Sequence, residues 1–173
     1  TTDWRRRFNN YSNFGFGLQY SFSDSNYISF EYSGNIEDLG GVVESHNSIL
    51  TTNNDIFYAT DVAKNDVRLN QFINLNYNVA NSTNGSSLFI GLQYSNYNSK
   101  VKDLINENGL VDALNSERFL KNNADYTINI VNTQADYTKK ISANSKLEVG
   151  TKFSSAAIKT SSAFLISDDD NTE

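Results

Sequence analysis

Apolar and polar side chains alternate along much of this sequence. The alternation is clearest in residues 14–22 (FGFGLQYSF) and 146–153 (KLEVGTKF), where every second side chain except Thr151 is large and apolar. A strict period of two is typical of a β-strand, because successive side chains point to opposite faces. The same pattern recurs around residues 27–32, 69–79, 88–95 and 126–141. The chain is therefore predicted to be all-β, with about six strands.

Short and long connections alternate between these strands. Turns near residues 24, 84 and 143 are short, and Asn84-Gly85 is a favoured pair where φ must be positive. Segments 34–66 and 98–125 are long and polar, so we expect them to be loops. An alternative for the first segment is that its flanks continue the strands beyond a membrane, and in the second we expect a short helix over residues 110–114. Short turns on one side and long loops on the other are typical of antiparallel transmembrane β-barrels, whose periplasmic turns are tight and whose external loops are long.

The two faces of the predicted strands differ in polarity. One face is apolar and suits lipid, whereas the other carries glycines with Gln19, Gln93, Glu148 and Lys152 and suits an aqueous lumen. Phe72 and Phe89 are exceptions on the polar face. Aromatic residues near the short turns are predicted to form an interfacial girdle, and these are Tyr20, Phe22, Tyr27, Tyr77 and Tyr137.

Composition narrows the class of protein. With no Cys and one His, the chain has no thiolate or multi-histidine metal site, and its apolar runs are far shorter than the roughly 18 residues of a membrane helix. A net charge of −6 with scattered basic residues argues against nucleic-acid binding. Because about eight strands are needed to close a barrel, we expect residues 1–173 to be part of one outer-membrane barrel domain, a fragment whose plug and remaining strands lie outside this chain.

Three polar clusters were considered as sites. Residues 4–8 (WRRRF) form the main basic cluster and precede a predicted strand. They suit an anionic headgroup, carboxylate or phosphate, although a solvated strand end is the favoured explanation. His46, near Glu44, would be the base for Ser45 or Ser48 in a barrel hydrolase, but a solvated loop histidine is favoured. Residues 168–171 (DDDN) lack the spacing of a calcium loop. We predict no catalytic, cofactor or metal site and no enzyme, and leave ligand-binding residues unassigned.

Two segments resemble the outer-membrane β-barrel region of TonB-dependent receptor-like proteins of Bacteroidetes type. They are residues 14–30 (FGFGLQYSFSDSNYISF) and residues 136–141 (DYTKKI) with 145–154 (SKLEVGTKFS). Lys140 stands where that family often has Pro. The resemblance covers about half of the chain and implies a barrel of about 22 strands with a plugged lumen, located in the cell outer membrane. It also implies TonB-dependent uptake of an unknown solute, with outer-membrane lipid and an energy-coupling protein as partners.

A different class of protein fits the same alternation. In a soluble or surface-exposed β-sandwich, or an adhesin-like binding module, the apolar face would be buried in a core between two sheets. Phe14, Phe16, Leu18, Leu147 and Val149 would then be core residues. The two alternatives differ in whether this face meets lipid or protein.

Overall fold

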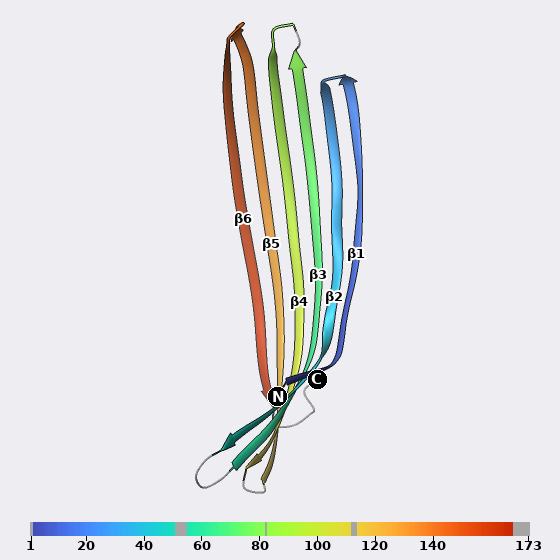
Figure 1. The fold of residues 1–173 in the computed structure, drawn as a ribbon, viewed down its shortest axis with the longest axis vertical. Coiled ribbons are helices and arrows are strands. Elements are labelled where there is room, and N and C mark those ends of the chain that lie inside the picture. Colours follow the sequence, from blue (N-terminus) through green and yellow to red (C-terminus); the bar gives the residue numbers. More distant parts are fainter. Residues whose placement is uncertain (1, 51–54, 82, 112–113, 168–173) are drawn as a thin grey trace.

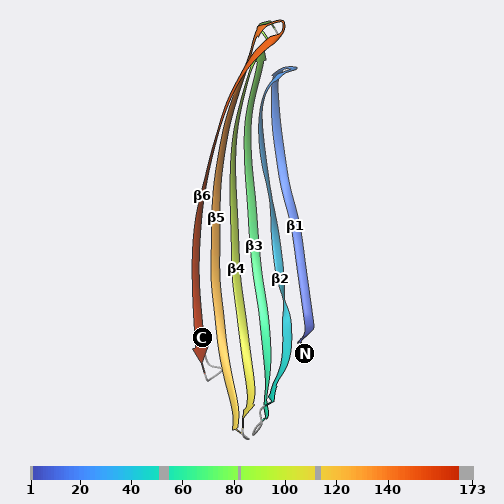
Figure 2. The same ribbon diagram turned by 60° about the vertical axis from the view of Figure 1, so that its left-hand side comes forward.

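A computed structural model shows one antiparallel sheet of six strands (Figures 1 and 2) and describes residues 2–50, 55–81, 83–111 and 114–167. The strands are β1 (Thr2–Ser23), β2 (Asn26–Leu50), β3 (Asp55–Asn81), β4 (Ser86–Val111), β5 (Leu114–Ser142) and β6 (Ser145–Ser167). Each strand pairs with its neighbour in sequence, so β1 and β6 are the two edges of the sheet. Within the described residues, no helix is long and apolar enough to cross a membrane.

The three predicted short turns are confirmed. They join β1 to β2, β3 to β4 and β5 to β6 and lie together at one end of the sheet, at the top of Figure 1. Gly85 has a φ of 63°, as expected for the Asn-Gly pair. Its amide donates to the carbonyl of Asn81 at 2.9 Å, and its carbonyl accepts from the amide of Lys140 at 3.2 Å.

The two predicted long loops are wrong. β2 continues to Leu50 and β3 begins at Asp55, while β4 ends at Val111 and β5 begins at Leu114. The short helix expected over residues 110–114 is therefore wrong at its described positions, and residues 112–113 lie outside the described residues. Cross-strand backbone pairing persists through both segments although their side chains are polar. The strands have 22 to 29 residues, far more than the roughly 9 to 11 that cross a bilayer.

A compact band of apolar side chains covers one face of the sheet near the short turns, and we call this face the band face. The apolar band consists of Phe14, Phe16, Leu18, Tyr20, Ile28, Phe30, Tyr32, Ile73, Leu75, Tyr77, Val79, Leu88, Ile90, Leu92, Tyr94, Val131, Thr133, Ala135, Tyr137, Val149, Thr151 and Phe153. On β4 it runs from Leu88 to Tyr94, six residue steps that span about 20 Å along the strand at ~3.3 Å per residue. This length is shorter than the roughly 25 Å height of the apolar belt of membrane barrels.

The sheet is a single layer without a core. Among the described residues the buried hydrophobic side chains are only Leu120 and Ala124, whereas Phe16 and Leu18 of the apolar band are 59% and 70% exposed. A sandwich would place a second sheet over these side chains, but all six strands belong to one sheet. The apolar band therefore faces the surroundings of the sheet and is not covered by the described part of the chain.

Candidate functional site

A row of amide and hydroxyl side chains crosses the face opposite to the apolar band. Glu31, Asn74, Gln93, Asn132 and Ser154 are register partners on five successive strands, and we call this row the amide ladder. Asn132 donates to Gln93 Oε1 at 3.0 Å and accepts from Ser154 Oγ at 2.6 Å. Asn74 donates to Glu31 Oε2 at 3.4 Å. The ladder lies at the level of the apolar band, so the sheet is apolar on one side and polar on the other at this level.

Glycines and further amides extend this polar face, as the alternation predicted. Gly17 is the register partner of Glu31, and Gly91 is the partner of Gln134. Asn76 donates to Ser29 Oγ at 3.3 Å. The strip around Gly15 and Gly17 is thus part of strand β1.

The aromatic exceptions on this face have local packing partners. The rings of Phe72 and Tyr97 meet edge to face at 5.4 Å between centroids. Ser95, the register partner of Phe72, is 5% exposed. The ring of Phe89 lies 3.2 Å from the position that a Cβ on Gly91 would occupy. Both phenylalanines therefore fill space beside small residues of the opposite face.

A charged cluster lies on the opposite face beyond the level of the apolar band. Arg68 Nη2 is 2.5 Å from Asp66 Oδ2, and Arg68 Nη1 is 3.4 Å from Glu37 Oε2. Ser99 Oγ donates to the other oxygen of Asp66 at 2.9 Å. The hydrogen bond to Asp66 raises the pKa of Arg68 above its ordinary value, despite an opposing effect of burial. Asp66 is 7% exposed, and both of its carboxylate oxygens have partners.

A hollow of about 180 Å³ adjoins this cluster. It is lined by Arg7, Lys64 and Arg68 together with Asp66 and apolar neighbours. Arg7 belongs to the basic cluster singled out in the sequence, but that cluster lies inside β1, with a register shift between Trp4 and Arg6, and does not precede the strand. Arg68 in this hollow is already paired with Asp66 and Glu37, so the lining is a mixed charged surface.

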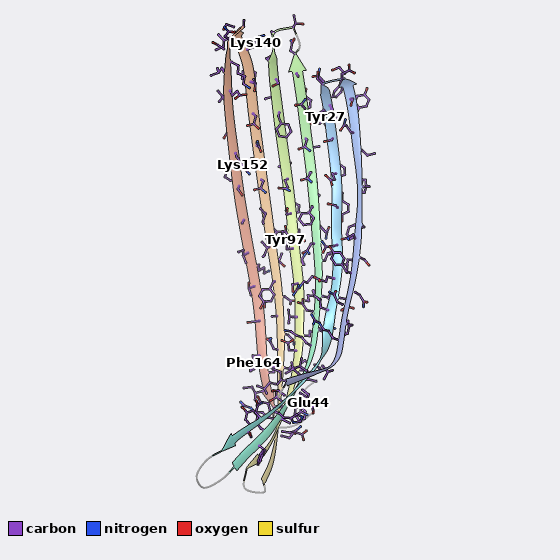
Figure 3. The ribbon with its side chains drawn as sticks, viewed as in Figure 1. Tyr27, Glu44, Tyr97, Lys140, Lys152 and Phe164 are labelled. Carbon is purple, nitrogen blue, oxygen red and sulfur yellow. The ribbon has the colours of Figure 1, made fainter. Side chains whose placement is uncertain are left out.

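His46 lies in β2 and not in a loop. Its Nε2 is 3.0 Å from Glu44 Oε1, at the end of the sheet away from the short turns, where Figure 3 labels Glu44. Strand alternation places Ser45 on the opposite face from His46 and Ser48 on the same face. The described residues include no group of three or more His, Cys, Asp or Glu side chains that could hold a metal ion. Residues 168–171 lie outside the described residues.

Tyrosines mark both borders of the apolar band. Tyr20, Tyr77 and Tyr137 lie on the band face near the short turns, as predicted. Tyr27 is the register partner of Ser21 and Asn78 on the opposite face, so its predicted place in the girdle is wrong. Phe22 lies at the register shift between Ser21 and Ser23.

A second tyrosine border, at the far side of the band, was missed by the sequence analysis. Tyr32 donates to Gln71 Oε1 at 3.1 Å, and Tyr94 donates to Asn129 Oδ1 at 2.8 Å. The residues beyond Tyr94 on the band face are Asn96 and Asn98, so the sequence signal is a tyrosine that ends an apolar alternation before a run of amides. Both hydroxyl groups lie where the surface changes from apolar to polar, as the hydroxyl of an interfacial tyrosine does.

Comparison with known proteins agrees with this two-faced sheet. No curated protein matches the chain. Residues 78–173, more than half of the chain, match the outer membrane protein beta-barrel family. The chain therefore belongs to this family and is located in the outer membrane, where its strands form barrel wall.

Proposed function

We propose that this chain forms part of the wall of a larger outer-membrane barrel that takes up a solute, with uptake driven by a TonB-type energy-coupling protein. In this proposal the band face contacts outer-membrane lipid and the opposite face lines the lumen. The amide ladder is the observation that carries the proposal. It presents uncharged donors and acceptors together with Glu31 at the level of the membrane, a surface suited to water and polar solutes.

The open edges of the sheet support a larger barrel. β1 and β6 each pair on one side only among the described strands. An unpaired backbone group in lipid costs several kcal/mol, and six strands are fewer than the roughly eight that close a barrel. Other strands, from the same protein or from partner copies, would pair with these edges.

Energy coupling is supported by the resemblance of two segments to TonB-dependent receptors. Both segments lie in regular strands: residues 14–30 span the β1–β2 hairpin, and residues 136–154 span the β5–β6 hairpin. If these hairpins belong to a plugged barrel, the plug and the segment that engages the energy-coupling protein lie in other parts of the protein. We propose no enzymatic activity and no nucleic-acid partner.

A comparison of three strains tests the proposal. Wild-type cells, cells lacking this protein and cells lacking the energy-coupling protein are grown in a rich defined medium, and depletion of every solute is followed by mass spectrometry. We expect at least one polar solute that wild-type cells consume and both deletion strains spare. A solute spared only by cells lacking this protein would contradict energy coupling. Equal depletion of all solutes in the three strains would contradict uptake.

A further inference from the structure

An open hollow of about 730 Å³ lies on the band face beyond the apolar band. Two adjacent rows of register partners line it across β4, β5 and β6. The residues of these rows are Asn98, Thr127 and Lys159, and Lys100, Asp125 and Ser161. The amide ladder contributes nothing to this hollow, and of the cluster around Asp66 only Ser99 lines it, together with Tyr126 of the same face. The charged side chains that line the hollow are Lys100, Asp125 and Lys159, and they lie on the band face, away from the proposed solute path.

The band face around this hollow is basic although the chain is acidic. The region considered lies beyond Asn96 on this face and ends at Asn106 on β4, Phe119 on β5 and Ser167 on β6. Within it, these three strands carry four lysines and one acidic residue, Asp125. The four lysines are Lys100, Lys102, Lys121 and Lys159. No ion pair or side-chain hydrogen bond joins them to another residue in the described ranges. Their charges are thus available to an external anion, in a chain whose net charge is −6.

A hydrogen-bonded floor separates the apolar band from these lysines. Asn96 Nδ2 donates to Asn129 Oδ1 at 2.7 Å, the same oxygen that accepts from Tyr94. Thr127 Oγ1 donates to Asn98 Oδ1 at 2.9 Å, and Asn98 in turn donates to Asn96. The donors and acceptors of these side chains are hydrogen-bonded to one another, which holds them in place. The lysines have no such partners within the described ranges and are therefore the groups that can bind a ligand.

The height of the hollow matches a lipid headgroup. Lys100 lies six residues beyond Tyr94 on β4, and Lys159 lies six residues beyond Phe153 on β6. Six residues span about 20 Å along a strand, and a barrel tilt of about 40° reduces the height above the band to about 15 Å. Lysine side chains also bend back toward a membrane surface. The ammonium groups therefore reach the zone immediately outside the hydrocarbon, on the side away from the short turns, which is the external side in this family of folds.

We propose that this hollow binds the phosphorylated headgroup of an outer-leaflet lipid, with Lys100 and Lys159 as the main phosphate-binding residues. Lysine binds phosphate as a point charge, and basic clusters beside a membrane attract anionic headgroups. Asp125 lies in the same row as Lys100 and opposes the phosphate. Removing the negative charge of Asp125 should strengthen phosphate binding, so this position offers a variant that is expected to bind lipid more tightly.

Lipid retained by the protein purified from outer membranes in mild detergent tests this site. Native mass spectrometry counts the phosphorylated lipids bound to each barrel. We expect the double variant Lys100→Gln with Lys159→Gln to retain about thirtyfold less and Asp125→Asn to retain as much as wild type or more. The matched control is Lys139→Gln with Lys140→Gln, which removes two lysines at the short-turn end and should retain lipid as wild type does. Heat-dependent gel mobility confirms that each variant is folded.

Three results would overturn the assignment. Equal retention by wild type and the Lys100 and Lys159 double variant would show that these lysines bind no lipid. Weaker retention by Asp125→Asn would contradict the electrostatic argument. If the native sample held no phosphorylated lipid and inorganic phosphate bound the purified protein through the same lysines, the site would be one for free phosphate. Because retention is scored on purified protein, the result does not depend on whether the barrel takes up a solute.

Discussion

The ring of Phe14 in β1 covers Gly34, its register partner in β2. A Cβ on Gly34 would lie 2.6 Å from Phe14 Cζ and 2.6 Å from the carbonyl oxygen of Asn70 in β3. The ring of Phe8 covers Gly40 in the same way. An aromatic ring over a cross-strand glycine restores the packing that the missing side chain would lose. These two pairs provide side-chain packing between the edge strand β1 and its neighbour β2.

Replacing Gly34 with Ala should destabilise the barrel by about 1–3 kcal/mol, because the new methyl group overpacks against a backbone oxygen and a ring. Urea unfolding of the purified protein, followed by gel mobility without boiling, measures the change. Gly17→Ala is the matched control, since a Cβ there would meet only the carbonyl oxygen of Phe30 at 3.5 Å. Equal urea midpoints for both variants would contradict the packing of Phe14 on Gly34.

Adjacent residues of β1 should respond oppositely to the same charge. Leu18 is 70% exposed, so Arg at this position would cost little in water but about 2–4 kcal/mol near the middle of a bilayer. Gln19 lies on the opposite face, and Gln19→Arg should fold nearly as wild type does. Folding yields into lipid vesicles compare the two. Equal yields would count against contact between the band face and lipid.

The far tyrosine border should contribute to stability through its hydroxyl groups. Tyr94→Phe removes the hydrogen bond to Asn129 and should cost about 1 kcal/mol. Tyr137→Phe is the control, because the Tyr137 hydroxyl has no hydrogen-bond partner among the described residues. Thermal unfolding in detergent micelles should separate the two variants. A larger loss of thermal stability for Tyr137→Phe than for Tyr94→Phe would contradict this prediction.

The cluster around Asp66 should stabilise the sheet over a wide pH range. Arg68→Gln leaves the buried carboxylate of Asp66 with Ser99 alone, and we expect a loss of about 1–2 kcal/mol, reduced by the partial exposure of Arg68. A raised pKa in the folded state means that the contribution of Arg68 is fully present below its unfolded pKa and is lost only as pH rises through the folded value. Because an arginine pKa already lies far above 9 in the unfolded chain and the pKa of Arg68 is raised further in the fold, the loss in urea midpoint should be the same at pH 7 and pH 9. A difference that vanished at pH 9 would contradict this pairing.

The strand content near the short turns could be predicted from sequence because apolar and polar side chains alternate strictly there. From residues 14 to 22 the alternation identified both the strand and its apolar face. Beyond the band the alternation weakens, since the band face turns polar at Lys100 and Lys102 while the opposite face gains apolar side chains such as Ile105 and Leu120. Strand pairing continues without this alternation, so segments 34–66 and 98–125 resemble loops in sequence.

The charged cluster could not be found from sequence spacing. Glu37, Asp66 and Ser99 come from three strands and are separated by about thirty positions each. Only the register of β2, β3 and β4 brings them together around Arg68. The amide ladder could be predicted only in part from the sequence. The alternation assigned Asn74 and Gln93 to the polar face, but their alignment into one row follows from the strand register.

Solvent accessibility along β4 tests the central claim most directly, and the absence of Cys from this chain makes single-cysteine spin labels practical. Labels are placed one at a time from Leu88 to Lys102 in the barrel reconstituted into vesicles, and relaxation by oxygen is compared with relaxation by a water-soluble nickel complex. We predict oxygen access at Leu88, Ile90 and Leu92, nickel access at Gln93, and nickel access on both faces beyond Asn98. Equal nickel access at Leu92 and Gln93 would contradict a lipid-facing band and, with it, the barrel wall.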